Sequence, residues 1–285
     1  MSKLTGAAIQ RFASLAPFPQ PQFIRTKYPV VLMHGFGMLA GLRRHGHLHE
    51  EAMNLRLHGV RAFAPNVAPY NTVPVRAEMW KGRIERILEE TGAEKVNLIA
   101  HSMGGLDARY LISRMEMHRY VASLVTVSTP HHGSPIAAFL FEQPEKIQTI
   151  VTDICNWLGS NALSESTSDF LTAVTALTYE NVCGMFNPET PDHPDVTYWS
   201  YAGQAGKGTG VPINPLLILF NSIIYKAEGV NDGFVSVESA KWGTFMGTID
   251  ADHIREVGLN IAPGGAFKSK EFYRNVVVRL AEEGF

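Results

Sequence analysis

Short apolar runs alternate with amphipathic segments along the first half of the chain. Apolar and β-branched residues dominate four runs, which predict buried strands at residues 28–33, 59–64, 96–100 and 121–127. Between residues 75 and 91 the apolar positions fall on one face of a helix, and residues 103–117 repeat this pattern. This alternation predicts an α/β fold, with a mostly parallel central sheet flanked by helices.

The alternation stops after residues 129–134. The later part of the chain predicts helices over 136–178, a loop over 187–195, a strand over 196–203, short strand and turn segments over 229–239, and a final helix through Phe272, Val276 and Leu280. A chain of 285 residues is compatible with one or two domains. We expect a single α/β domain over residues 1–285, with a helical insertion at about 136–186.

Composition and charge exclude several classes of partner. The chain carries 25 Lys and Arg against 27 Asp and Glu, without a basic stripe, so nucleic acid is not an expected partner. Apolar runs such as residues 216–220 are far shorter than the roughly 20 residues of a membrane-spanning helix, so we expect no transmembrane segment. Residues 1–27 lack the apolar block of a signal peptide, which predicts a cytoplasmic protein as written, and a secreted one if a leader was removed.

The two cysteines, Cys155 and Cys183, are too few for a disulfide framework. They lack the spacing of a redox or zinc motif. We therefore expect two free thiols, with a single bridge between them as the alternative.

A candidate nucleophile lies where a predicted strand becomes a predicted helix. The sequence there is Ala100-His101-Ser102-Met103-Gly104-Gly105. A serine at such a sharp turn exposes its hydroxyl above the sheet, and small residues are needed two positions before and after it. Gly104 fits, and Ala100 replaces the usual leading glycine. The alternative is an ordinary helix cap, because serine is a preferred N-cap residue.

A serine nucleophile needs a base and an acid, which follow it in the order Ser, acid, His in this topology. His131 and His132 come too early to leave room for an acid, and His193 lies in the predicted loop, so His253 remains. Asp232 lies at a predicted turn between the two and is the best acid. Taken singly, the histidine and the aspartate could each be an ordinary loop residue. Their joint order with Ser102 favours a catalytic triad.

Two backbone N–H groups are needed to stabilise an oxyanion. We expect them from Met103, which follows the nucleophile, and from Phe36 in the glycine-containing loop after the first strand. The same loop matches a dinucleotide-binding fingerprint, G-x-G-x-x-A, over residues 35–40. That fingerprint requires an acidic residue at the end of the next strand, and residues 62–66 contain none. We therefore discount nucleotide binding.

Several motifs in the same order make the chain resemble the bacterial triacylglycerol lipases of the α/β-hydrolase superfamily, the group typified by Pseudomonas and Burkholderia lipases. They are PVVLMHGFG at 29–37, EKVNLIAHSMGG at 94–105, VASLVTVSTPHHGSPIA at 121–137, YWSYAG at 198–203, NDGFVSVESAKWG at 231–243 and ADHIREV at 251–257. The resemblance implies ester hydrolysis through an acyl-enzyme, with Ser102, His253 and Asp232 as the triad. It also implies that residues 136–186 form a lid and acyl-binding walls, with transient contact to a lipid interface.

The chain departs from this family at a calcium site. The resemblance implies carboxylate ligands two residues after the catalytic histidine and in an Asp-Pro pair roughly 20 residues before the catalytic aspartate, and calcium requires such hard anionic oxygens. Arg255 and Asn214 occupy these positions. We expect no calcium, and expect Arg255 to brace the His253 loop through a hydrogen bond to a carboxylate or carbonyl. The family's disulfide is also missing, because Glu238 lies about where one cysteine should be.

No other metal or cofactor is expected. His45, His47 and His49 alternate along the chain rather than sharing one helical face, which favours a solvated loop over a metal site. The sequence thus predicts a carboxylic ester hydrolase acting on a lipid or another apolar ester, most simply a triacylglycerol lipase or a lipase-like esterase. Two alternatives stay open: an acyltransferase with the same triad, and a non-catalytic relative that binds a hydrophobic ligand.

Overall fold

A computed structural model describes residues 23–35, 48–68, 71–143, 145, 149, 170–259 and 267–285. Six parallel strands form one sheet in the order β2-β1-β3-β4-β5-β6. The strands are β1 (Val30–Met33), β2 (Ala62–Phe63), β3 (Val96–His101), β4 (Val121–Val127), β5 (Thr197–Gly203) and β6 (Thr244–Ile249). The predicted α/β fold with a parallel central sheet is confirmed.

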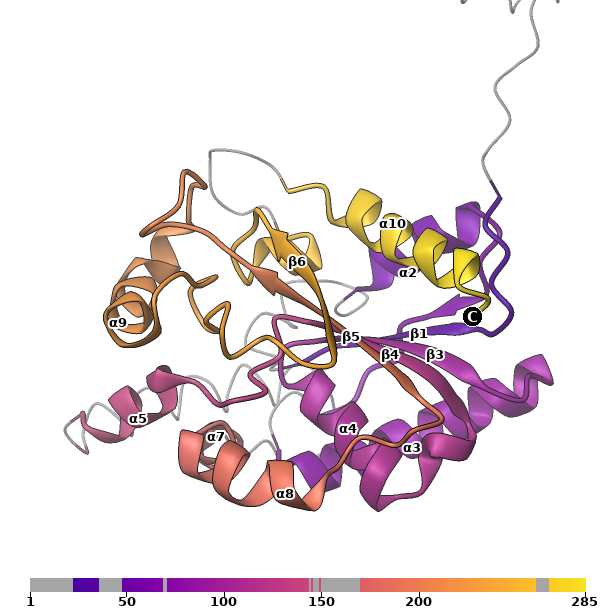
Figure 1. Ribbon diagram of the computed structural model, residues 1–285, viewed down its shortest axis with the longest axis horizontal. Helices are drawn as coiled ribbons and strands as arrows, with labels where there is room; N and C mark the ends of the chain where they lie inside the picture. The colour runs from indigo at the N-terminus through magenta and orange to yellow at the C-terminus, as the bar shows by residue number, and fades with distance from the viewer. Residues whose placement is uncertain are drawn as a thin grey trace, which may run out of the picture.

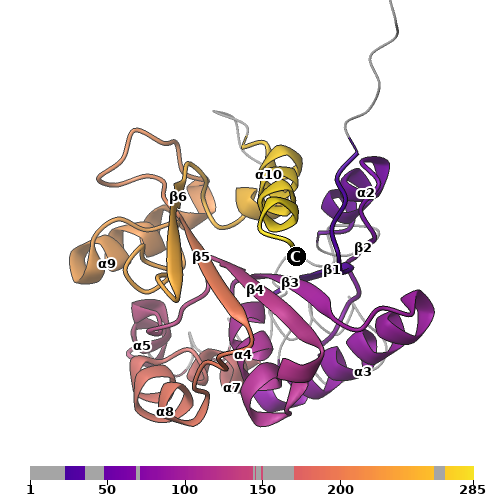
Figure 2. The same ribbon diagram turned by 45° about the vertical axis from the view of Figure 1, so that its right-hand side comes forward.

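Helices cover both faces of this sheet (Figures 1 and 2). In Figure 1, α2 (His49–Leu57) and α10 (Ser269–Glu282) lie above the sheet, and α3 (Val73–Thr91) and α4 (Gly104–Arg114) lie below it. Each face has its own apolar core, one built with Trp80 and Ile84 of α3 and the other with Tyr273 and Val277 of α10. Burial on both faces explains why β1 is wholly apolar and why apolar residues predominate in β3 and β4.

The remaining helices gather on one side of the molecule in both views. They are α5 (Pro135–Phe141), α7 (Phe170–Thr175), the π-helical turn η3 (Glu180–Phe186), α8 (Asn187–Glu189) and α9 (Ile218–Glu228). Short 3₁₀ turns complete the described elements: η2 (Met117–Arg119), η4 (Pro215–Leu217) and η5 (Arg255–Val257). Most of the central part of the predicted insertion, residues 144–169, lies outside the described residues, so its role as a lid stays a prediction.

Local signals set the limits of α3. The Thr72 side chain accepts a hydrogen bond from the N–H of Val75, and a proline stands in the first turn. Gly92 ends the helix in the left-handed conformation, with φ of 62°. The amphipathic pattern that predicts a helix at residues 75–91 therefore includes the first turn as well.

Two expectations differ from the structure. The strand predicted at 59–64 forms only two residues, Ala62–Phe63, at the edge of the sheet. The strand and turn segments predicted at 229–239 form bends around one isolated antiparallel bridge, between Asn231 and Ser236. The last strand of the sheet is β6 instead, which follows at Thr244–Ile249. No residue of β6 is fully buried, so its sequence lacks the apolar run that marks the inner strands.

No helix in the described part of the chain combines the length and apolar character needed to span a membrane.

Candidate active site

Ser102 lies at a strained turn between β3 and α4. Its φ is 57°, a value that non-glycine residues rarely adopt. Hydrogen bonds on both sides hold this conformation: the Ser102 N–H donates to the carbonyl of Val127, and Thr129 Oγ1 donates to the Ser102 carbonyl at 2.7 Å. The sharp turn predicted for the nucleophile is therefore present, and backbone strain of this kind is concentrated at functional sites.

Backbone from the end of β1 crosses this turn at very short range. A Cβ atom on Gly35 would lie 2.6 Å from Cβ of Ser102 and 2.7 Å from the backbone nitrogen of Met103. A Cβ atom on Gly104 would lie 2.8 Å from the carbonyl oxygen of His34. Glycine is thus required at both positions for the two segments to pack. Ala100 is buried in β3, so the replacement of the usual leading glycine is accommodated.

The predicted base and acid lie in line with Ser102. His253 Nε2 is 2.9 Å from Ser102 Oγ, and His253 Nδ1 is 2.7 Å from Asp232 Oδ2. A carboxylate only accepts hydrogen bonds, so Nδ1 carries the proton and Nε2 is left to accept from the serine hydroxyl. The backbone N–H of His253 also donates to the carbonyl of Asp232, at 3.0 Å. The three residues, separated by up to 151 positions, form one chain of hydrogen bonds.

Asp232 is fully buried and is held from the opposite side. Its Oδ1 accepts from the N–H groups of Phe234 and Val235, at 2.8 and 2.7 Å, which leaves Oδ2 directed to His253. The preceding residue, Asn231, exchanges hydrogen bonds with Asn221 of α9. Helix α9 therefore anchors the turn that carries the acid.

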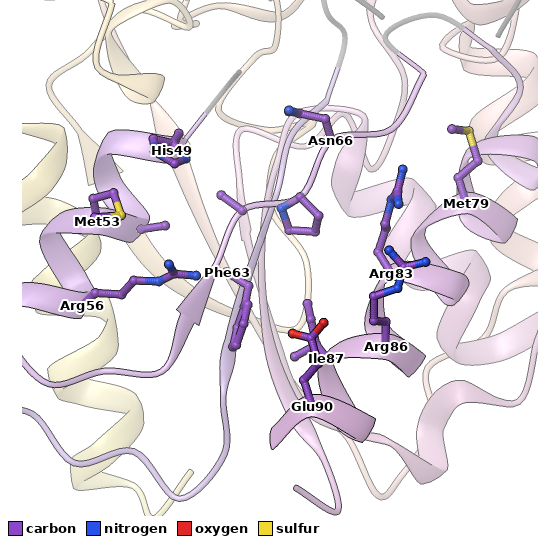
Figure 3. A pocket seen from close by; sticks show the side chains of 13 residues that line it. His49, Met53, Arg56, Phe63, Asn66, Met79, Arg83, Arg86, Ile87 and Glu90 are labelled. Atoms are coloured by element: carbon purple, nitrogen blue, oxygen red, sulfur yellow. The ribbon is translucent and has the colours of Figure 1, made fainter. Parts of the chain in front are cut away.

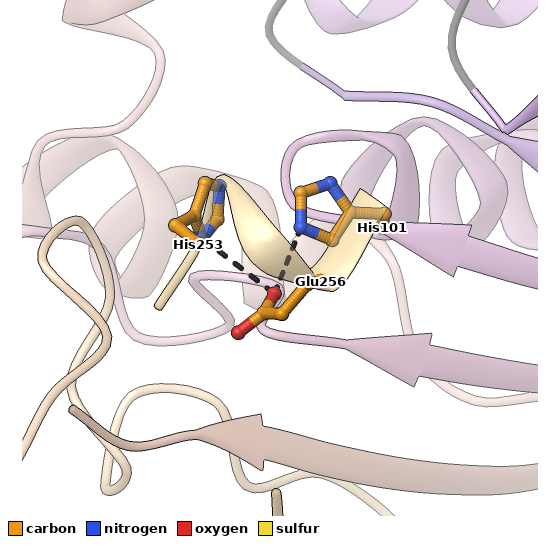
Figure 4. A group of neighbouring side chains, drawn as sticks. All are labelled: His101, His253 and Glu256. Atoms are coloured by element: carbon orange, nitrogen blue, oxygen red, sulfur yellow. Dashed lines mark hydrogen bonds and ion pairs between the residues drawn. The ribbon is translucent and has the colours of Figure 1, made fainter. Parts of the chain in front are cut away.

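A second acidic residue, Glu256, lies beside this chain. Its Oε2 is 2.8 Å from His101 Nε2 and 3.8 Å from His253 Nδ1, as Figure 4 shows. Ser128 Oγ donates to the other oxygen at 2.8 Å. Complete burial, followed by the nearby charge of Asp232, raises the pKa of Glu256 well above its ordinary value.

The sequence alone does not single out Glu256. The only signal was its position three residues after His253, which places both on the same short turn. His101, Glu256 and His253 are also close enough to ligate a metal ion, their ligand atoms lying within 4.8 Å of one another. His253 Nδ1 already donates to Asp232, and Glu256 already binds His101 and Ser128. The cluster is thus engaged as a hydrogen-bond network.

Of the two predicted oxyanion donors, Met103 is among the described residues and Phe36 is not. Met103 follows Ser102 directly and is buried, with its backbone nitrogen beside Gly35. Phe36, the second predicted donor, lies outside the described residues, as do Cys155, His45 and His47. Cys183 is a free, half-buried thiol, as expected.

The three later histidines that are not assigned to the triad, His131, His132 and His193, have other contacts. The buried ring of His131 lies 3.0 Å from Thr126 Oγ1, and His132 Nδ1 lies 3.3 Å from the carbonyl of Ser239. His193 stacks on His118, with ring centroids 3.8 Å apart. None of these three rings contacts Ser102 among the contacts described. His253 is therefore the histidine of the described chain that reaches the serine.

The residues at the position of the family's calcium site do not fit that ion. The side chain of Arg255 is buried there, and its Nη1 donates to the carbonyl of Pro212 at 2.6 Å, in agreement with the expected brace. Asn214 supplies a neutral amide, whose Oδ1 accepts from the N–H of Leu216 at 3.1 Å. A guanidinium repels a divalent cation, and calcium needs several anionic oxygens.

A hollow of about 560 Å³ lies at the edge of the sheet formed by β2, between α2, β2 and α3 (Figure 3). Figure 3 shows Arg56 on one side and Arg83 and Arg86 on the other, with Phe63, Ile87 and Glu90 between them. The lining contains none of the three residues of the hydrogen-bond chain. This hollow is therefore separate from the candidate active site.

The known proteins that are similar to this chain include lipases. Residues 70–180 match the model of the PGAP1-like alpha/beta domain. A triacylglycerol lipase from Burkholderia plantarii is 32% identical over 320 residues, covering 92% of this chain and 88% of that protein. Triacylglycerol lipase 2 from Saccharomyces cerevisiae is 31% identical over 213 residues, covering 70% of this chain, which spans only 58% of the yeast protein's length.

Solved structures show the same fold. The structure of a metagenomic carboxyl esterase superposes with a TM-score of 0.71 at 17% identity, over 95% of this chain and 80% of that one. The mature form of a lipase from Bacillus licheniformis superposes with a TM-score of 0.63 at 22% identity, over 93% of this chain and 95% of that one. Both are similar in fold to the sheet and helices described above.

Proposed function

Because this chain belongs to the triacylglycerol lipase family and has the α/β-hydrolase fold, we propose that it hydrolyses carboxylic esters with an apolar acyl chain through a serine mechanism. In this proposal Ser102 is the nucleophile, His253 is the general base, and Asp232 is the carboxylate that orients His253. The observation that carries the proposal is the pair of hydrogen bonds, 2.9 and 2.7 Å long, that runs from Ser102 through His253 to Asp232.

The first half of the reaction forms an acyl-enzyme. Ser102 Oγ attacks the ester carbonyl carbon while His253 Nε2 takes the hydroxyl proton, and Asp232 stabilises the resulting imidazolium. The N–H of Met103, with that of Phe36 as the second donor, stabilises the negative charge on the carbonyl oxygen. When the tetrahedral intermediate collapses, the C–O bond to the alcohol breaks, and His253 gives its proton to the leaving alkoxide.

The second half releases the acid. Water attacks the acyl-enzyme carbonyl as His253 Nε2 removes one of its protons, and the C–O bond to Ser102 then breaks. His253 returns the proton to Ser102 Oγ, so the enzyme is unchanged and one water is consumed for each ester. No step needs a metal ion or an organic cofactor.

The family and the insertion at residues 136–186 both favour a lipid ester as the substrate. Triacylglycerol is the substrate named for the Burkholderia and yeast relatives, and we extend it to this chain as its lipid ester substrate. We assign the insertion at residues 136–186 to a lid that contacts a lipid interface. At its described end, Tyr179 and Met185 are exposed apolar side chains.

The test combines active-site labelling with a substrate panel. A fluorophosphonate should label the protein and should fail to label Ser102→Ala, which should also lose turnover of a p-nitrophenyl ester while keeping its melting temperature. Ser113→Ala is the matched control, because Ser113 lies in α4, the helix that follows the nucleophile, outside the hydrogen-bond chain. Full turnover by Ser102→Ala would refute the mechanism.

The panel decides the substrate. Triglyceride emulsions and short soluble esters should be compared with and without an oil interface, and faster hydrolysis of emulsions supports the lipase assignment. Preferential transfer of the acyl group to an added alcohol would point to an acyltransferase. An absence of both labelling and turnover would leave a ligand-binding relative.

A further inference from the structure

The turn that carries His253 is tied to a second loop by a buried cation. Arg255 lies two residues after His253 and is 1% exposed. Its Nη1 donates to the carbonyl of Pro212 at 2.6 Å, and its Nε lies 3.4 Å from Asp252 Oδ2. The guanidinium therefore joins residues on both sides of His253 to the loop that precedes η4.

Asp252 supplies the negative charge at this junction. It is fully buried, and its Oδ1 accepts from the N–H groups of Ile254 and Arg255, at 3.2 and 3.0 Å. Its Oδ2 accepts from the N–H of Asn214 at 3.0 Å. A buried carboxylate is costly without a counter-charge, and the positive charge of Arg255 lies next to it.

The same loop also contacts the turn of the acid. A Cβ atom on Gly233, the residue after Asp232, would lie 2.8 Å from Cβ of Leu217, so the two segments are packed together. The N–H of Leu217 donates to the carbonyl of Asn214 at 2.9 Å, which links this contact to the Asp252 junction. Residues 212–217 thus contact both the turn that carries Asp232 and the turn that carries His253.

This arrangement stands where the resemblance to bacterial lipases implies a calcium site. Relative to the family pattern, the two carboxylates are replaced by the neutral Asn214 and by the cation Arg255. The chain therefore provides its own positive charge where the family uses a metal ion. Arg255 makes one short hydrogen bond, while its Nε and Nη2 have no hydrogen-bond partner among the described residues. Its contribution is thus mainly the charge beside Asp252.

We propose that Arg255 is a positioning residue that holds the His253 turn against residues 212–214 in place of a calcium ion, so that hydrolysis is independent of calcium. This inference rests on the proposed triad. Arg255 touches neither the ester nor the reacting atoms, and it acts through the placement of His253. Misplacing a catalytic group by about 1 Å can cost roughly 100-fold in rate, which sets the size of the expected effect.

The experiment compares Arg255→Ala with wild type on a soluble p-nitrophenyl ester. We expect kcat to fall roughly 10- to 100-fold with KM changed by less than about threefold, because substrate contacts are intact. Millimolar guanidinium chloride should restore part of the rate by filling the vacated space, whereas urea at the same concentration should not. Wild-type activity should be the same in EDTA and in calcium.

The control is Arg83→Ala, which removes an arginine of α3 that is remote from the triad; its rate should match wild type and should not respond to guanidinium. Should Arg255→Ala fail to fold, Arg255→Lys takes its place, with an intermediate kcat expected because the charge is kept and the reach is lost. The proton NMR signal of His253 Nδ1–H reports the placement directly and should shift or broaden in either variant.

Two results would overturn the inference: a wild-type kcat for Arg255→Ala, or a loss of wild-type activity in EDTA that calcium restores. Both are distinguishable from failure of the proposed function. If the triad assignment itself is wrong, wild type shows no fluorophosphonate labelling at Ser102. If only the positioning role is wrong, wild type is labelled and active, and Arg255→Ala equals it.

Discussion

The carboxyl group of Glu256 occupies the space into which a side chain at position 203 would project. A Cβ atom on Gly203 would overlap Oε1 of Glu256 and would lie 2.9 Å from Cβ of Asp232. Gly203 ends β5, and its N–H donates to Ser128 Oγ at 2.9 Å, which itself donates to Glu256. The missing side chain at the end of β5 therefore makes room for a second carboxyl group beside Asp232 and His253.

Gly203→Ala should lower both stability and activity, because the new methyl group must displace Glu256 or Asp232. Overpacking a filled site costs typically about 1–3 kcal/mol in the free energy of unfolding. Urea unfolding and p-nitrophenyl ester turnover measure the two effects. Gly82→Ala is the matched control: nothing lies within 4 Å of a Cβ atom there, and alanine should stabilise helix α3 by roughly 0.5–1 kcal/mol. Wild-type stability in Gly203→Ala would contradict the packing.

Glu256 should make the protein less stable as pH rises. Burial and the charge of Asp232 raise its pKa well above the ordinary value of 4.5, so the folded state holds this proton more tightly than the unfolded state does. The stability that this proton contributes is fully present below pH 4.5 and is lost as pH rises through the folded-state pKa. In Glu256→Gln the group cannot ionise, and this loss should be absent.

The measurement is the difference in free energy of unfolding between Glu256→Gln and wild type, followed from about pH 5 to about pH 8. The difference should move in favour of the variant as pH increases. Glu238→Gln is the control, since Glu238 is largely exposed and pairs with Lys241 on the surface. A difference for Glu256→Gln that is independent of pH would show that the carboxyl group ionises as easily in the folded protein as in the unfolded chain.

The strand-to-helix motif, the order Ser, acid, His and the elimination of earlier histidines select Ser102, Asp232 and His253, and the structure places these three in hydrogen-bond contact. Nothing in the sequence selects Glu256, because its contacts with Ser128, just after β4, and with Gly203, at the end of β5, form only in the folded chain. The inner strands β1, β3 and β4 were predicted because burial on both faces favours apolar residues along each strand. The edge strand β6 was missed because it is half-exposed and lacks a continuous apolar run. β2 was predicted too long because the apolar Val60 and Ala64 flank the two residues that pair with β1.

Gly35→Ala should impair catalysis strongly and should also lower stability. Its Cβ atom would lie 2.6 Å from Cβ of Ser102 and 2.7 Å from the nitrogen of Met103, so either the nucleophile or the oxyanion donor must move. Loss of one oxyanion donor costs roughly 100- to 1000-fold in kcat in other hydrolases, and we expect a fall of that order. Stopped-flow fluorophosphonate labelling and a thermal melt separate the two effects. A variant that reacts at the wild-type rate would show that the loop at Gly35 can retreat without cost.

Arg76 should be essential for stability, because it neutralises the fully buried Asp107. Its Nη2 lies 2.8 Å from Asp107 Oδ2 and also donates to the carbonyl of His34 at 2.9 Å, while Nη1 donates to the carbonyl of Ala68. Burial raises the pKa of Asp107 to about 6 in spite of this pairing, because it disfavours the charged carboxylate.

Arg76→Met should therefore lose about 3–5 kcal/mol in the free energy of unfolding, since removing one partner leaves a buried charge uncompensated. The double variant Arg76→Met/Asp107→Leu should recover much of that loss, because the charge is removed as well. Denaturant unfolding of the two variants and of Arg83→Met, a control in the same helix, provides the comparison. A double variant no more stable than Arg76→Met would mean that the hydrogen bonds of Arg76 to His34 and Ala68, rather than its pairing with Asp107, stabilise this region.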